Sequence, residues 1–131
     1  MGTPPPFGAL SGVFVLVAED DADARHILES LLTYLGALVS TAPSAAAALN
    51  ILGQVRADVV VCDVNLGDQD ALWLIEEARR HQPDTPFIAV SGRDYDEHEM
   101  LRAGFAASLT KPVRQDLLIS TILRAVGRGP E

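Results

Sequence analysis

The feature that most constrains the fold is a regular alternation between short apolar runs and segments of helical periodicity. The apolar runs occupy residues 13–18, 37–41, 58–63, 86–90 and 107–110. Two of them, at 13–18 and 58–63, are apolar at successive positions, as expected of strands that are covered on both faces. Strands of this kind, joined by helices, predict a parallel sheet with a layer of helices on each side.

Five helices are expected between and after these runs. Apolar residues at three- and four-residue spacing, or a suitable cap, mark them at about 24–35, 45–52, 71–81, 94–103 and 117–126. Ser44 and Asp70 are suitable N-caps for the second and third helices, and Gly36 is a natural stop for the first. The sequence therefore predicts an α/β fold: a doubly wound, five-stranded parallel sheet with five helices.

The length of 131 residues and the apolar content of 48% suit one compact domain with a substantial core. We expect this domain to span residues 12–127. Residues 1–11, which include three consecutive prolines from Pro4 to Pro6, are predicted to form a flexible Pro/Gly-rich tail before it. Residues 128–131 are predicted to form a short C-terminal tail.

Composition argues against several classes of protein. The apolar run at 13–18 is far shorter than the roughly 20 residues of a membrane span, and the first residues lack the pattern of a secretory signal. The single cysteine, Cys62, fits a reducing compartment, so we expect a cytoplasmic protein without membrane contact. Ten basic against eighteen acidic residues give a net charge of −8, which argues against direct nucleic-acid binding.

Polar residues gather where the predicted strands end. Glu19 and Asp20 follow the first run, Asp63 ends the third, Ser91 follows the fourth and Lys111 follows the fifth. In doubly wound sheets the binding site lies outside the carboxyl ends of the strands. We therefore expect these five side chains at one edge of the sheet.

Three carboxylates in one small cleft require compensation by a cation. Two like charges about 4 Å apart repel by about 4 kcal/mol at an effective dielectric of about 20. Mg²⁺ suits oxygen ligands of this kind. We expect Asp20 and Asp63 to bind Mg²⁺ directly, the backbone carbonyl of Asn65 to be a third ligand, and Glu19 to act through water.

Asp63 ends an apolar strand and is the candidate nucleophile. A carboxylate at this place can attack a phosphoryl group if nearby cations neutralise the transferred oxygens. Lys111, the one lysine of the chain, can supply such a charge, and Ser91 can offer a hydroxyl to the same oxygens.

Four segments in order, VFVLVAEDDADAR, DVVVCDVNL, PFIAVSG and LTKPV, resemble the receiver domain of two-component response regulators, including those attached to hybrid sensor kinases. The resemblance covers about residues 12–127 and implies the flavodoxin-like receiver fold. It also implies Mg²⁺-dependent phosphoryl transfer from a kinase histidine to Asp63, with Glu19 and Asp20 as the acidic pair, Ser91 as the hydroxyl residue and Lys111 as the cation.

The resemblance implies further roles in phosphorelay signalling. The Asn65 carbonyl would bind the metal and its side chain would lie at the rim where hydrolytic water approaches. The partner would be a sensor histidine kinase or a histidine phosphotransfer protein, received by the first helix and its adjoining loops. Such a domain is a signalling phosphoacceptor that forms and loses an aspartyl phosphate, and it catalyses only its own phosphorylation and dephosphorylation.

Several residues depart from the family pattern. Glu19 stands where the family usually has Asp, Gly67 replaces the customary Pro four positions after Asp63, and Ala71 replaces a usual Gly. Ser108 stands where the family generally has an aromatic residue that moves with phosphorylation. The segment between Ser91 and Lys111 is also slightly shorter than usual, which predicts an abbreviated fourth helix.

The sequence leaves alternative functions to consider. The main alternative is a receiver-like interaction module that does not depend on phosphorylation, which the absent aromatic at Ser108 favours. A phosphoaspartate-forming hydrolase would need its acid pair at the strand end and a cap, and a topoisomerase-primase metal domain would need an acid at Asn65. The sequence does not decide between a stand-alone phosphate shuttle and a piece of a larger protein. It also does not identify the cognate kinase or the oligomeric state.

Overall fold

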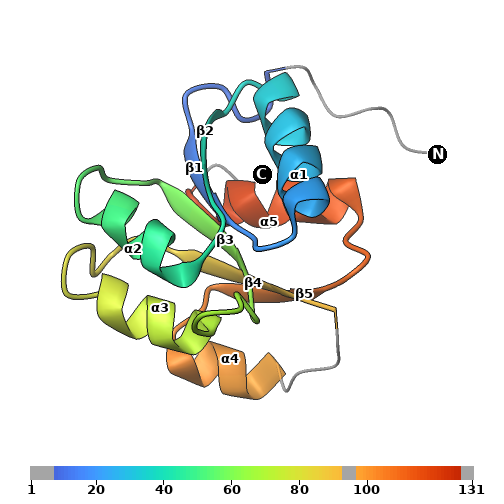
Figure 1. Ribbon diagram of the computed structural model, residues 1–131. Coiled ribbons are helices and arrows are strands. Elements are labelled where there is room, and N and C mark those ends of the chain that lie inside the picture. The colour runs from blue at the N-terminus through green and yellow to red at the C-terminus, as the bar shows by residue number, and fades with distance from the viewer. Residues whose placement is uncertain (1–7, 93–96, 128–131) are drawn as a thin grey trace.

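The computed structural model describes residues 8–92 and 97–127, and a single five-stranded sheet lies at the centre of this part of the chain (Figure 1). Neighbouring strands are all parallel, in the order β2-β1-β3-β4-β5. Their bounds are β1 Phe14–Ala18, β2 Leu38–Ala42, β3 Val59–Asp63, β4 Phe87–Ser91 and β5 Ala107–Thr110. The predicted doubly wound parallel sheet is confirmed, with each strand within one residue of its expected position.

The five helices cover both faces of the sheet. They are α1 Ala22–Tyr34, α2 Ala45–Leu52, α3 Ala71–Ala78, α4 Glu97–Ala103 and α5 Gln115–Ala125. Figure 1 shows α1 and α5 on one side of the sheet and α2, α3 and α4 on the other. None of these helices is long and apolar enough to cross a membrane.

Each strand contributes side chains to two separate hydrophobic clusters. On β1, Leu16 and Ala18 pack with the residues of α2, α3 and α4, whereas Val15 and Val17 pack with those of α1 and α5. Successive side chains of a strand point to opposite faces, so a strand covered on both sides is apolar at every position. This explains why the first and third apolar runs show no alternation of polar residues.

Capping residues fix where the first three helices begin. The side chains of Asp21, Ser44 and Asp70 accept hydrogen bonds from the backbone N–H groups of Ala24, Ala47 and Trp73, three residues further on. The N-caps expected at Ser44 and Asp70 are confirmed. The chain after α1 turns at Gly36, whose φ of 98° favours glycine, as its predicted role as a helix stop requires.

The third helix is shorter than predicted. It ends at Ala78, and the following turn is held by bonds from Arg80 N to the Glu77 carbonyl and from His81 N to the Ala78 carbonyl. The backbone makes one further helical bond, from Gln82 N to the Ala78 carbonyl at 2.8 Å, and the buried Gln82 side chain bonds to Ala57 N and to the Leu52 carbonyl. Tertiary contacts of this kind leave no periodic signal in the sequence.

The packed part of the chain begins earlier than residue 12. Residues 8–11 form a turn, Leu10 is fully buried in the α1/α5 cluster, and Leu10 N donates to the Leu35 carbonyl at 2.9 Å. The predicted tail at 1–11 is therefore too long at its inner end. Residues 1–7, the tail at 128–131 and the expected start of the fourth helix near Asp94 lie outside the described residues.

Candidate functional site

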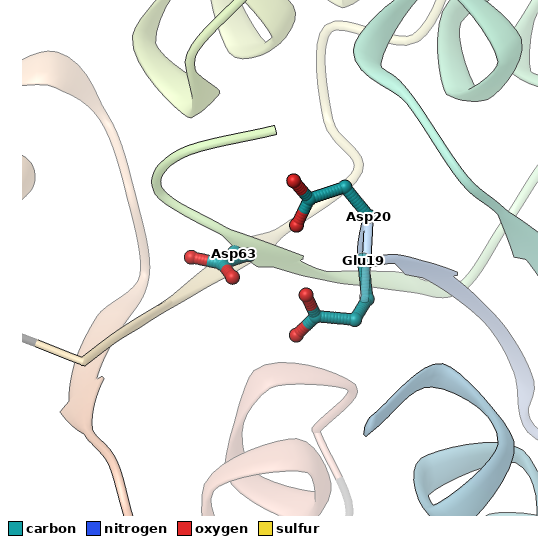
Figure 2. A group of neighbouring side chains, drawn as sticks. All are labelled: Glu19, Asp20 and Asp63. Atoms are coloured by element: carbon teal, nitrogen blue, oxygen red, sulfur yellow. The ribbon is translucent and has the colours of Figure 1, made fainter. Parts of the chain in front are cut away.

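Three carboxylates converge at the carboxyl edge of the sheet (Figure 2). Glu19 and Asp20 follow β1 directly, and Asp63 is the last residue of β3. β1 and β3 are neighbours, with Ala18 opposite Cys62, so the next residues on each strand come together. One carboxylate oxygen from each of the three residues lies within 4.8 Å of the others. This is the juxtaposition predicted from the strand ends.

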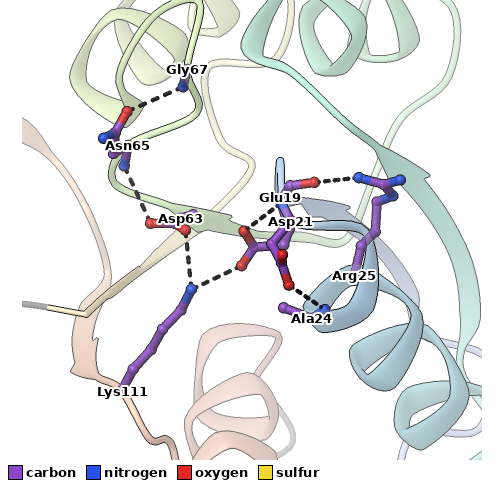
Figure 3. Close-up of polar contacts among 8 residues, drawn as sticks. All are labelled: Glu19, Asp21, Ala24, Arg25, Asp63, Asn65, Gly67 and Lys111. Atoms are coloured by element: carbon purple, nitrogen blue, oxygen red, sulfur yellow. Dashed lines mark hydrogen bonds and ion pairs between the residues drawn. The ribbon is translucent and has the colours of Figure 1, made fainter.

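The Lys111 ammonium lies between two of these carboxylates (Figure 3). Its Nζ is 3.0 Å from Glu19 Oε1 and 3.0 Å from Asp63 Oδ2. The backbone of Lys111 is fixed to the end of β4, because its N–H donates to the Ser91 carbonyl at 2.6 Å. The cation expected from the sequence is thus in contact with the expected nucleophile.

Burial and charge act together on this ion cluster. Desolvation raises the pKa of Glu19, although the hydrogen bond from Lys111 opposes the shift. Burial alone would lower the pKa of Lys111, but its hydrogen bonds to Glu19 and Asp63 outweigh this effect and raise that pKa. The ammonium is therefore held in its charged form.

The loop after β3 folds back on Asp63. Asn65 N donates to Asp63 Oδ1 at 3.2 Å, and Gly67 N donates to Asn65 Oδ1 at 3.1 Å (Figure 3). The Asn65 side chain therefore lies along its own loop. Gly67 has a φ of 86°, and a Cβ on it would lie 3.4 Å from Asp20 Oδ2, so the loop backbone passes beside the Asp20 carboxylate.

Ser91 is the buried last residue of β4. Asp63 pairs with Val90 in the register of β3 and β4, so Ser91 stands one residue beyond that pair, at the same edge of the sheet. In the register of β4 and β5, Ser91 pairs with Thr110, and Lys111 is the next residue after Thr110. The five residues predicted from the strand ends are therefore on one edge.

Two further residues hold Glu19 in place. Asp21 N donates to Glu19 Oε2 at 3.1 Å, and Arg25 Nη1 donates to the Glu19 carbonyl at 2.8 Å (Figure 3). The sequence pattern does not mark Arg25 as a site residue. It is a half-buried residue of an amphipathic helix, where an arginine gives no sequence signal of a contact six residues back.

The donor set fits a hard divalent cation. Carboxylate oxygens gathered within a few ångströms are the ligands that Mg²⁺ prefers, and one ammonium leaves part of their negative charge uncompensated. Cys62, next to Asp63, is fully buried, and burial raises the pKa of its thiol, so it remains protonated and does not compete as a ligand.

An apolar hollow of about 310 Å³ adjoins Lys111. It lies between the first half of α1 and the start of the α5 region, and is lined by Glu19, Ala24, Ile27, Leu28, Val90, Lys111, Pro112, Val113 and Leu118. Ile27 is 65% exposed, an unusual degree for an isoleucine. The site thus opens onto an apolar surface on its α1 side.

Comparison with known proteins agrees with this geometry. A family profile for the response regulator receiver domain matches residues 15–123. An uncharacterized 14.6 kDa protein of Leptolyngbya boryana is 36% identical over 108 residues, which cover 79% of this chain and 82% of that protein. The regulator of RpoS from Escherichia coli K12 is 32% identical over 107 residues, which cover 80% of this chain but only 32% of the regulator.

Solved structures give the same result at the level of the fold and the family. The receiver domain of the Francisella response regulator 1452 superimposes with a TM-score of 0.83 at 28% identity, covering 89% of this chain and 98% of that one. The family match spans most of the chain and includes every residue of the acidic site and its lysine, from Glu19 to Lys111. The chain therefore belongs to the receiver domains of response regulators, the signalling proteins of two-component systems.

Proposed function

We propose that Asp63 accepts a phosphoryl group from the phosphohistidine of a sensor kinase or a histidine phosphotransfer protein. The observation that carries the proposal is the Lys111 ammonium, 3.0 Å from Asp63 Oδ2 and 3.0 Å from Glu19 Oε1, beside the exposed Asp20. A nucleophilic carboxylate, a cation and an acidic pair are the groups that phosphoryl transfer to aspartate requires.

In this reaction an Asp63 oxygen attacks phosphorus. The new O–P bond forms as the N–P bond of the phosphohistidine breaks, and the electron pair of that bond stays on the imidazole nitrogen. Lys111 leaves its contact with Asp63 Oδ2 and binds an oxygen of the transferred group. The buried Ser91 offers its hydroxyl from the end of β4.

The metal in this proposal is Mg²⁺. Asp20 and Asp63 would bind it directly, the Asn65 carbonyl would be a third ligand and Glu19 would act through water; Glu19, Asp20 and Asp63 are the three acids that the fold brings together. When bound, Mg²⁺ neutralises charge on the phosphoryl oxygens. The Asn65 side chain, held to Gly67 N within its loop, lies at the rim of the site.

The partner docks on α1 and the loop that precedes α5. The apolar hollow beside Lys111, with Ile27 exposed on its α1 wall, supports this surface because it lies next to the nucleophile. A partner helix with a phosphohistidine on an apolar face has the matching chemistry. We place this encounter in the cytoplasm, where a single free cysteine is stable.

A phosphorylation-independent interaction module is the second candidate function. Ser108 of β5, where the family generally has an aromatic, favours it, because a serine buries too little apolar area to bias two conformations. The intact contact between Asp63 and Lys111 favours the phosphoacceptor.

Incubation with phosphoramidate and Mg²⁺, followed by intact-mass measurement, tests the proposal. The wild-type protein should gain one phosphoryl mass, Asp63→Asn should gain none, and the control Asp84→Asn, changed at an exposed loop, should label like wild type. Full labelling of Asp63→Asn would move the acceptor elsewhere. An unlabelled wild-type protein would favour the interaction module.

A further inference from the structure

The loop between β3 and α3 has lost the proline that the family usually places in it. Gly67 stands at that position with a φ of 86°. Proline is locked near −65° and cannot adopt this conformation, whereas glycine can. The loop therefore follows a path that no proline ring restrains, and only its contacts with the rest of the protein can hold it.

Asp68, the next residue, supplies such a contact. Its Oδ1 accepts a hydrogen bond from Ala45 N at 3.0 Å, and its Oδ2 accepts one from Ala46 N at 3.0 Å. These are the first two N–H groups of α2, which have no partner within the helix. One carboxylate thus fastens the β3–α3 loop to a helix more than twenty residues earlier in the chain.

The fastened loop also borders the acidic site. One hydrogen bond links it to Asp63, from Asn65 N to Asp63 Oδ1, and a second bond, from Gly67 N to Asn65 Oδ1, lies within the loop. Gly67 passes beside the Asp20 carboxylate, since a Cβ there would lie 3.4 Å from Asp20 Oδ2. Asp68 is therefore one residue away from the point where the loop meets Asp20.

We propose that Asp68 is a positioning residue, which holds the β3–α3 loop against α2 and so keeps the Asn65 carbonyl and Asp20 in place for Mg²⁺. The inference rests on the proposed function of the site, and it adds a residue that acts on the metal through the loop. Hydrogen bonds from Ala45 and Ala46 lower the pKa of Asp68, which keeps the carboxylate ionised at neutral pH. A helix cap without this role would stabilise α2 and leave the site unchanged.

Magnesium titration of four proteins by calorimetry tests the proposal: wild type, Asp68→Ala, Asp68→Asn and the control Asp84→Ala. Asp68→Ala should weaken Mg²⁺ binding about tenfold, the lower end of the range for groups that support metal ligands. Asp68→Asn should lose less, because the amide oxygen can still accept one of the two N–H groups. Asp84→Ala, an equal charge change at an exposed loop, should bind like wild type.

Equal losses in Asp68→Ala and Asp68→Asn would assign the effect to the lost charge and would overturn the proposal. Wild-type Mg²⁺ affinity in Asp68→Ala would also overturn the proposal. At saturating Mg²⁺, Asp68→Ala should reach the wild-type rate of labelling by phosphoramidate, because Asp63 and Lys111 are untouched. A lower rate at saturation would also overturn the proposal, because it would show that the substitution acts on more than Mg²⁺ binding.

Amide hydrogen exchange separates this inference from the proposed function. In Asp68→Ala the amides of Ala45, Ala46 and Gly67 should exchange faster, while those in the middle of β3 should not change. A wild-type protein that binds no Mg²⁺ would contradict the proposed function, and the exchange result would still decide whether Asp68 holds the loop. Unchanged exchange at Gly67 would show that it does not.

Discussion

Glu19 and Asp20 are neighbours in sequence with different surroundings. Glu19 is 2% exposed, and its two oxygens accept from Lys111 Nζ and Asp21 N. Asp20 is exposed, and the loop at Gly67 passes beside its carboxylate. The buried Glu19 carboxylate is less accessible to a cation than the exposed Asp20 carboxylate, so we expect the two acids to contribute unequally to metal binding.

Asp20→Ala should therefore weaken Mg²⁺ binding more than Glu19→Ala. We expect a loss of about 100-fold for the first and about tenfold for the second, within the range measured around protein metal sites. Removal of Glu19 also frees Lys111 from one of its two partners. Calorimetry is the appropriate measurement, because it reports metal binding directly. Equal losses, or a larger loss for Glu19→Ala, would contradict the assignment.

The sequence predicted the residues whose position follows from strand order. Asp63 and Lys111 each end or follow an apolar run, and parallel strands bring such residues to one edge. Arg25 and Asp68 could not be predicted in this way. Their partners are backbone groups, a carbonyl in one case and two N–H groups in the other, and backbone groups have no sequence signature.

At the level of elements, the turn between α3 and β4 depends on one buried side chain. Gln82 is 5% exposed, and its amide accepts from Ala57 N and Thr85 Oγ1 and donates to the carbonyls of Leu52 and Val55. These bonds join the end of α2 and the start of β3 to the end of α3. The regular helix ends at Ala78, three residues before the predicted end at His81, and these bonds hold the turn that follows it.

Gln82→Ala should lower the free energy of unfolding by about 3 kcal/mol, because buried N–H and C=O groups would lose their partners. Chemical denaturation measures this change. The matched control is Gln54→Ala, since Gln54 is exposed and makes one side-chain bond of 3.4 Å to Asn50. We expect the control to change stability by less than about 0.5 kcal/mol. Similar values for the two variants would contradict a structural role for Gln82.

Across the whole molecule, the sheet separates two hydrophobic clusters whose strand residues differ in size. Near the carboxyl edge, Ala18, Cys62 and Ala89 face the α2, α3 and α4 side. Val17, Val61 and Val90, each one residue away, face the α1 and α5 side. The sequence predicted strands buried on both sides, but the assignment of each residue to a side required the packing of the helices.

Ala89→Val should destabilise the protein by about 1–3 kcal/mol, although valine is the better strand former, because Ala89 is fully buried and the added methyl groups overpack its cluster. Denaturant unfolding gives the value. Leu38→Val, at a residue 64% exposed on the edge strand β2, is the control and should change stability by less than about 0.5 kcal/mol. If Ala89→Val is as stable as wild type, the space around Ala89 accepts a larger side chain and the two faces of the sheet do not differ in the side-chain volume that they accept.

The difference in size has a consequence for how the strands find their register. In a sheet with one face exposed to solvent, a slip of one residue is unfavourable because it would bury the polar and charged side chains of that face. The central strands of this sheet carry apolar side chains on both faces, so a slip would bury no additional polar group and would not be prevented in this way. A shifted strand would instead press valines into spaces shaped for alanine and cysteine. Steric fit, rather than avoidance of water, thus keeps Asp63 aligned with Glu19 at the end of the sheet.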